Sequence, residues 1–123
     1  MEKLKKSIIS PDLNIKQALK HMDDAAEKTL FVVDAQNGLL GSVTDGDIRR
    51  WILRGESLGE GISQVMNANP VFLKEGYSQE EAKGLMISKG IECIPIVDDE
   101  KRIVSTIWWV DFFENAFKKH EPV

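Results

Sequence analysis

The feature that most constrains the fold of this chain is an internal repeat. When the sequence is shifted by 64 residues, its two halves align without a gap. Identical residues then coincide at Ala18 and Ala82, Met22 and Met86, Val33 and Val97, Asp34 and Asp98, and Asp47 and Asp111. A repeat of this size cannot bury its own hydrophobic face, so the two copies must pack on each other. The sequence therefore predicts two related units, residues 1–60 and 61–123, in one module.

Each unit is predicted to contain an extended entry strand, a helix, two strands and a second helix, an α+β arrangement of the order β-α-β-β-α. In the first unit, apolar residues recur at the spacing of one helix face: Ile15, Ala18, Leu19 and Met22. Residues 30–33 form an apolar run typical of a strand buried on both faces, and residues 39–43 return after a turn. A helix over residues 46–54 completes the unit. We expect the two sheets to pack face to face about a pseudo-twofold axis and to enclose one core.

Composition and charge exclude several classes of protein. Hydrophobic residues make up 42% of the chain, too many for a disordered protein. A net charge of −4 disfavours a nucleic-acid partner, which would need a basic surface. No apolar run approaches the ~20 residues that span a membrane, and the single Cys cannot form an internal disulfide. These features predict a soluble, cytoplasmic protein that binds neither nucleic acid nor membrane.

Residues with catalytic or metal-binding chemistry are few. His21 and His120 have no partner at the spacing of metal ligands. Cys93 precedes a predicted buried strand, where it is expected to pack as a small hydrophobic residue. The sequence contains no phosphate-binding P-loop, zinc-protease or nucleophile-elbow motif. We therefore expect no metal site and no enzymatic activity in these residues.

The segment from Gly41 to Arg50 combines groups suited to a nucleotide. It leaves a predicted strand and opens a helix, whose first backbone N–H groups can bind an anion. Thr44 adds a hydroxyl and Arg50 a positive charge, while the Asp47 carboxylate could accept hydrogen bonds from ribose hydroxyls. The Thr44-x-x-Asp47 spacing is equally that of a helix capping box. From spacing alone, both interpretations remain open.

The chain resembles a pair of cystathionine β-synthase (CBS) domains, known as a Bateman module. The resemblance rests on the tandem units and on three segments, residues 41–47, 66–71 and 94–98. It implies a regulatory module that binds an adenine nucleotide (AMP, ADP, ATP, or in some members S-adenosylmethionine) between its halves. The nucleotide would act as a regulatory ligand, and no cofactor would be required. By this resemblance Thr44 would contact phosphate and Asp47 the ribose.

The same resemblance implies two unequal sites. The nucleotide-binding residues would be Thr44, Asp47, Arg50, Lys28, Thr29, Val43, Val71, Ile91 and Glu92. In the second copy, Trp108 stands where the first has Thr44, so the phosphate-facing hydroxyl is missing. That second site would be degenerate and would involve Asp111, Trp108, Cys93 and Ile9.

A narrower resemblance concerns the proteins that carry such pairs. The segment from Val43 to Arg50 is similar to that of CBS pairs found before the catalytic domain of sugar-phosphate nucleotidyltransferases, and to that of some sugar-phosphate isomerases. It implies that a C-terminal catalytic domain follows this module in a longer chain, with the module controlling it. The alternative is a ligand-free dimerisation module that forms a homodimer through its helices. Four aromatic residues expected to be exposed would serve that interface: Trp51, Phe112, Phe113 and Phe117.

Overall fold

The computed structural model describes residues 2–112, together with the side chains from Leu4 onward. The first half contains α1 (Glu2–Ser7), β1 (Ile8–Ile9), α2 (Ile15–Ala25), β2 (Thr29–Val33), β3 (Leu39–Thr44) and α3 (Asp45–Leu53). A connector with the short 3₁₀ helix η1 (Ile62–Gln64) leads to the second half. That half contains β4 (Leu73–Lys74), α4 (Gln79–Lys89), β5 (Cys93–Val97), β6 (Ile103–Trp108) and helical residues 109–112.

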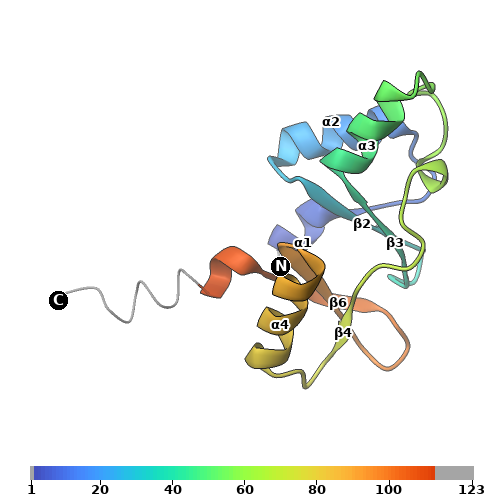
Figure 1. Ribbon diagram of the computed structural model, residues 1–123. Helices are drawn as coiled ribbons and strands as arrows, with labels where there is room; N and C mark the ends of the chain where they lie inside the picture. The colour runs from blue at the N-terminus through green and yellow to red at the C-terminus, as the bar shows by residue number, and fades with distance from the viewer. Residues whose placement is uncertain (1, 113–123) are drawn as a thin grey trace.

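Two three-stranded sheets form the centre of the molecule, ordered β1-β2-β3 and β4-β5-β6 (Figure 1). In each sheet the central strand pairs in parallel with the first strand and antiparallel with the third. The registers repeat with the 64-residue offset: Thr29 pairs with Thr44, and Cys93 pairs with Trp108. The predicted α+β fold of two repeated units packed sheet to sheet is confirmed.

Helices α2 and α3 form where the sequence pattern places them. The apolar stripe of α2 is buried through Ile15, Ala18 and Met22, and a capping box between Asn14 and Gln17 fixes the start of this helix. Both partners donate a backbone N–H to the other's side chain, which satisfies two of the helix's unpaired donors. The predicted strand over residues 30–33 is found as β2, with its last four residues buried.

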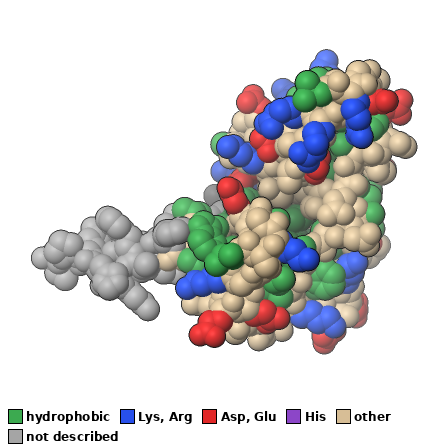
Figure 2. Space-filling model, in the orientation of Figure 1, with side chains coloured by type: hydrophobic (Ala, Val, Ile, Leu, Met, Phe, Trp, Pro, Cys, Tyr) green, Lys and Arg blue, Asp and Glu red, His purple; other side chains and the backbone are tan. Residues whose placement is uncertain are grey.

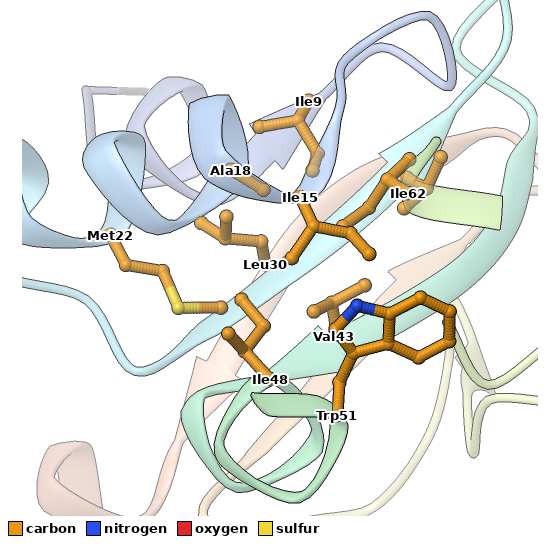
Figure 3. Packing of buried hydrophobic residues seen from close by; sticks show 10 residues of the cluster. Ile9, Ile15, Ala18, Met22, Leu30, Val43, Ile48, Trp51 and Ile62 are labelled. Carbon is orange, nitrogen blue, oxygen red and sulfur yellow. The ribbon is translucent and has the colours of Figure 1, made fainter. Parts of the chain in front are cut away.

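The buried residues that the structure describes form three clusters, so the expected single core is wrong. One cluster lies between the first sheet and helices α2 and α3; Figure 3 shows the side chains of its members pointing toward one another. A second cluster lies between the second sheet and α4. The third joins the two sheets and includes Phe31, Leu39 and Val97. Three clusters form because each sheet has two faces, one covered by helices and the other by the opposite sheet.

The expectation that Trp51 is exposed is also wrong. Trp51 belongs to the first cluster, is 8% exposed, and donates its Nε1–H to the Ser57 carbonyl at 2.8 Å. The connector thereby folds back over α3 and covers the indole. Phe112 is partly buried against the second cluster, which lies between the second sheet and α4. Phe113 and Phe117, with the predicted helix that carries them, lie outside the described residues.

Candidate functional site

A cleft of about 400 Å³ opens between the two halves of the molecule. Its walls come from the start of β2, the end of β3, the segment before β4 and the entry to β5. The lining residues are Lys28, Thr29, Phe31, Ser42, Thr44, Asp45, Asn67, Pro70, Val71, Gly90, Ile91, Glu92 and Cys93. Both repeats therefore contribute to the same cavity.

The repeat explains why residues so far apart in sequence meet here. Lys28 and Glu92 occupy equivalent positions, one residue before the central strand of each half. In each half the carbonyl of this residue accepts a backbone N–H from the helix that follows the third strand: Asp45 donates to Lys28 at 3.0 Å, and Trp109 donates to Glu92 at 2.7 Å. Because the sheets pack face to face, these two equivalent corners lie against the same cleft.

A third wall comes from the segment that links the halves. Asn67 pairs with Ser42 of β3 through two backbone hydrogen bonds, of 3.0 and 2.8 Å. Gly41 permits this pairing, since a Cβ there would lie 2.8 Å from the Asn67 carbonyl oxygen and 2.8 Å from the Met66 sulfur. The glycine thus allows the linking segment to lie close to the strand, and Asn67, Pro70 and Val71 then form one side of the cleft.

Thr44 and Asp47 form a capping box at the start of α3. The Thr44 N–H donates to Asp47 Oδ2 at 2.9 Å, and the Asp47 N–H donates to Thr44 Oγ1 at 3.1 Å. The capping interpretation of this spacing is confirmed. The Thr44 hydroxyl uses a lone pair in this contact, so its proton can still be donated to a ligand in the cleft.

Six of the nine residues expected at the nucleotide site line the cleft: Lys28, Thr29, Thr44, Val71, Ile91 and Glu92. The other three do not. The Val43 side chain is fully buried in the first cluster because it points to the helix-covered face of β3. Arg50 is exposed and forms an ion pair with Asp47, at 2.8 Å from Nη2 to Oδ1. The Asp47 side chain, 26% exposed, is held by this pair and by the capping box.

The residues expected at a second site are dispersed. Cys93 lies in the cleft with Thr44, and Ile9 is buried in the first cluster. Trp108 and Asp111 repeat half of the capping geometry, since the Trp108 N–H donates to Asp111 Oδ2 at 2.9 Å. The Trp108 indole packs against the cluster between the sheets, and its Nε1–H donates to Thr106 Oγ1 at 3.0 Å.

Sequence reasoning missed several residues of the cleft, and only some had a detectable pattern. Asp45 directly follows Thr44, but the motif spacing drew attention to Asp47 instead. Asn67 and Pro70 stand beside Val71 in a segment already singled out. Ser42 lies in the segment over residues 41–47 that was also singled out. Phe31 and Gly90 had no local pattern, because their place in the cleft depends on how the two sheets pack.

Among the described residues, no group of three or more His, Cys, Asp or Glu side chains could hold a metal ion. In the β5–β6 turn, the backbone N–H and guanidinium of Arg102 lower the pKa of the Asp98 carboxyl below its ordinary value of 3.8. None of the described helices is long and apolar enough to cross a membrane.

Curated proteins similar to this chain are much longer than it is. Over 83 residues it is 32% identical to arabinose 5-phosphate isomerase GutQ of Salmonella typhi, covering 68% of this chain and 26% of the isomerase. Over 108 residues it is 37% identical to an inosine-5'-monophosphate dehydrogenase of Nitrosopumilus maritimus, covering 88% of this chain and 22% of the dehydrogenase. The chain thus spans about a quarter of the length of these relatives.

Solved structures share this fold over most of the chain. Protein MJ1225 of Methanocaldococcus jannaschii superposes with a TM-score of 0.83 at 26% identity, covering 91% of this chain and 46% of that protein. The CBS domain pair of protein MJ0100, in complex with 5'-methylthioadenosine and S-adenosyl-L-methionine, gives a TM-score of 0.79 at 22% identity, covering 91% and 88%. The family model of the CBS domain matches residues 6–54 and again residues 62–107. This chain therefore belongs to the CBS domain family and carries the domain twice, as a tandem pair.

Proposed function

We propose that this chain is a regulatory module that binds an adenine nucleotide in the cleft between its halves and controls an attached or partner enzyme. The observation that carries the proposal is the cleft itself, because both repeats line it. Its volume of about 400 Å³ lies in the usual range of small-molecule sites.

The chemistry of the walls suits a nucleoside. Phe31, Pro70, Val71 and Ile91 present apolar surface against which a base can pack. Thr44 and Asp45 also line the cleft. Their side chains offer a hydroxyl donor and a carboxylate acceptor for the hydroxyl groups of a sugar. Residues 41–47 resemble the family's ligand motif, and this resemblance also supports Thr44 as a contact to the ligand. Asp47 does not line the cleft, and its two carboxylate oxygens accept from Arg50 and from the Thr44 N–H.

The connection between the halves suggests how binding could be transmitted. At the opposite ends of the central strands, the two hairpin turns are tied together: Leu39 donates its N–H to Lys101 at 3.0 Å, and Ile103 donates to Asn37 at 2.9 Å. The two sheets are thus joined at their hairpin turns, while the cleft lies at the opposite ends of the strands. A ligand that contacts both halves in the cleft would therefore change the angle between the two sheets. Such a ligand shifts the equilibrium only by its difference in affinity for the two arrangements.

For the regulated enzyme, we propose one that acts on sugar phosphates, with a sugar-phosphate nucleotidyltransferase as the first candidate. The similarity of residues 43–50 to the pairs found in such enzymes supports this class. The match to arabinose 5-phosphate isomerase GutQ supports sugar-phosphate chemistry more generally. In a longer chain the catalytic domain would follow residue 123.

Isothermal titration of the purified chain with AMP, ADP and ATP tests nucleotide binding. We expect binding at one site per chain, abolished by Val71→Trp, because Val71 lines the cleft and belongs to none of the three buried clusters. Leu53→Trp is the matched control, since Leu53 is 78% exposed on α3. Absence of binding to any adenine compound, in a chain that unfolds cooperatively, would refute the proposal.

A second candidate function is homodimerisation without a ligand. Large apolar side chains are exposed on helical surfaces, including Leu53 on α3 (78% exposed) and Ile87 on α4 (70% exposed). If dimerisation is the main role, Leu53→Glu or Ile87→Glu should convert a dimer to a monomer in analytical ultracentrifugation. Adenine nucleotides would then leave the dissociation constant of the dimer unchanged.

A further inference from the structure

We propose that a second cavity, at the end of the first sheet away from the cleft, binds a guanidinium group carried on an apolar stem. An arginine side chain of a partner protein and a free guanidino compound both present this group. The proposal goes beyond nucleotide binding, because this cavity shares no lining residue with the cleft.

The second cavity has a volume of about 380 Å³ and lies where the parallel strands β1 and β2 end. Ile9 and Val33 form part of an apolar wall, along which the methylene groups of a long cationic side chain can pack. Two carboxylates, those of Asp12 and Asp34, line the cavity, and no Lys or Arg side chain is among its described lining residues. The lining therefore attracts a cation that has an apolar stem.

The Asp34 carboxylate is held in position by its own hairpin. Its Oδ1 accepts the backbone N–H of Gln36 at 2.9 Å and that of Gly38 at 2.8 Å. Among the described residues, no group donates a hydrogen bond to Asp34 Oδ2, although a carboxylate oxygen can accept two. The carboxylate is thus oriented before a ligand binds, and one of its oxygens remains available.

The internal repeat shows which group such a carboxylate binds. Asp98 is the counterpart of Asp34, and its Oδ1 likewise accepts two backbone N–H groups of its hairpin, both at 2.9 Å. There the Arg102 Nε–H also donates to Asp98 Oδ2, at 2.8 Å. The counterpart of Arg102 in the first half is Gly38, which has no side chain to reach Asp34. The first half therefore has the carboxylate of this ion pair without the guanidinium.

Gly38 also leaves the available oxygen uncovered. A Cβ at this position would lie 2.6 Å from Asp34 Oδ2, so a larger residue would crowd the carboxylate. The Lys and Arg side chains that Figure 2 shows on this half gather over α2 and α3. Arg49 and Arg50 are paired there with carboxylates of the same helix. A guanidinium that enters the cavity therefore breaks no ion pair of the described residues.

The polar groups of the lining favour a guanidinium over a primary amine. A guanidinium has five N–H donors in one plane, so it can donate to Asp34 Oδ2 and also to a second acceptor, Ser10 or Asp12. It is also more weakly hydrated than an ammonium group, so it loses less on leaving water.

Titrations of the intact chain, followed through amide chemical shifts in NMR, test the proposal. Agmatine represents a free guanidino compound, and N-acetylarginine N-methylamide represents an arginine side chain of a protein. We expect saturable shifts of the Gln36 and Gly38 amides, with dissociation constants in the millimolar range. The Glu100 and Arg102 amides should not shift, because Asp98 already binds Arg102. Tighter binding of agmatine would assign the site to a free compound, and tighter or equal binding of the arginine derivative to a partner protein.

The corresponding citrulline derivative is the control ligand, because its side chain is similar in shape and uncharged. It should bind at least about tenfold more weakly than the arginine derivative. This comparison needs only the wild-type chain. Equal binding of the two derivatives, or no saturable shift with either cationic probe, would overturn the proposal.

Asp34→Asn identifies the carboxylate. The amide oxygen can still accept from Gln36 and Gly38, but the charge is lost, so both cationic probes should bind at least about tenfold more weakly. Asp99→Asn is the matched control, because Asp99 is exposed in the β5–β6 turn and does not line the cavity. Thermal unfolding verifies that each variant is folded. Unchanged binding to folded Asp34→Asn would refute the site, whereas nucleotide binding in the cleft is measured separately and does not depend on this result.

Discussion

The substitution Gly41→Ala tests the close contact between β3 and the linking segment around Asn67, which forms one wall of the cleft. Gly41 lies in β3, and a methyl group on it would come within 2.8 Å of the Asn67 carbonyl oxygen. It would also come within 2.8 Å of the Met66 sulfur, but a flexible Met side chain can move aside. The Asn67 oxygen cannot move alone, because the backbone of this residue is held to Ser42 by two hydrogen bonds.

The cost follows from these contacts. Adding a methyl group to a well-packed interior costs about 1–3 kcal/mol, and each of the two backbone hydrogen bonds contributes about 1 kcal/mol if it is lost. We therefore expect Gly41→Ala to lower the free energy of unfolding by about 2 kcal/mol. For a chain of this size, the corresponding fall in Tm is roughly 8 °C. Urea unfolding and thermal unfolding of the two proteins give both quantities.

Gly84→Ala provides the control. Gly84 lies inside α4, and a Cβ there would have no neighbour within 4 Å. Replacing a glycine in a helix interior by alanine stabilises by about 0.5–1 kcal/mol, so the two glycine substitutions should act in opposite directions. If Gly41→Ala were neutral, or stabilised as Gly84→Ala does, the close approach of the linking segment to β3 would not be the reason for this glycine.

Three further substitutions test other parts of the structure. Leu30→Ala should cost about 2–5 kcal/mol in urea unfolding, because Leu30 is fully buried in the first cluster; a cost below about 1 kcal/mol would contradict that packing. Trp51→Phe removes the hydrogen bond to the Ser57 carbonyl, so it should lower the free energy of unfolding by about 1–2 kcal/mol. It should also increase protease cleavage in the connector over residues 55–61. Unchanged cleavage would show that the indole does not hold this segment. Asp98→Asn should destabilise at neutral pH. The pKa of Asp98 is lowered in the folded chain, so its contribution is complete above the ordinary value of 3.8 and is lost as pH falls through the folded pKa. The difference between wild type and variant in urea midpoint should therefore shrink in acid, and a difference that persisted there would refute the assignment.

The elements that could be predicted are those whose pattern is local. The helix carrying Ile15, Ala18 and Met22 follows from a 3.6-residue period, and β2 from a continuous apolar run. The repeat then predicted the second half, and the registers of the two hairpins agree with its 64-residue offset. The burial of Trp51 could not be predicted, because it depends on the connector folding back to accept its indole N–H.

Of the residues expected at the nucleotide site, those next to strand ends line the cleft, and those whose side chains point to the other face of a strand do not. Thr44, Lys28 and Glu92 adjoin the ends of strands, and all three line the cleft. Val43 is adjacent to Thr44, but alternate residues of a strand point to opposite faces, so its side chain enters the first cluster instead. Asp45 was missed because the capping spacing fits Asp47, and capping consumes the hydrogen-bonding groups that would otherwise identify a ligand contact.

The two sides of the pseudo-twofold axis differ in ways that bear on how many ligands can bind. The 64-residue offset places α1 opposite the linking segment around Asn67. On one side, Asn67 pairs with Ser42 as extended backbone and forms a wall of the cleft. On the other side, the equivalent chain is helical, and its Leu4 packs with Trp108 against the cluster between the sheets. Thr106, the counterpart of Ser42, uses its hydroxyl to accept from the Trp108 indole. On one side of the axis the wall is extended chain and the hydroxyl is that of Thr44. On the other side, helix α1 replaces the extended chain and the Trp108 indole replaces the hydroxyl. Duplication of the fold therefore does not imply duplication of the binding chemistry.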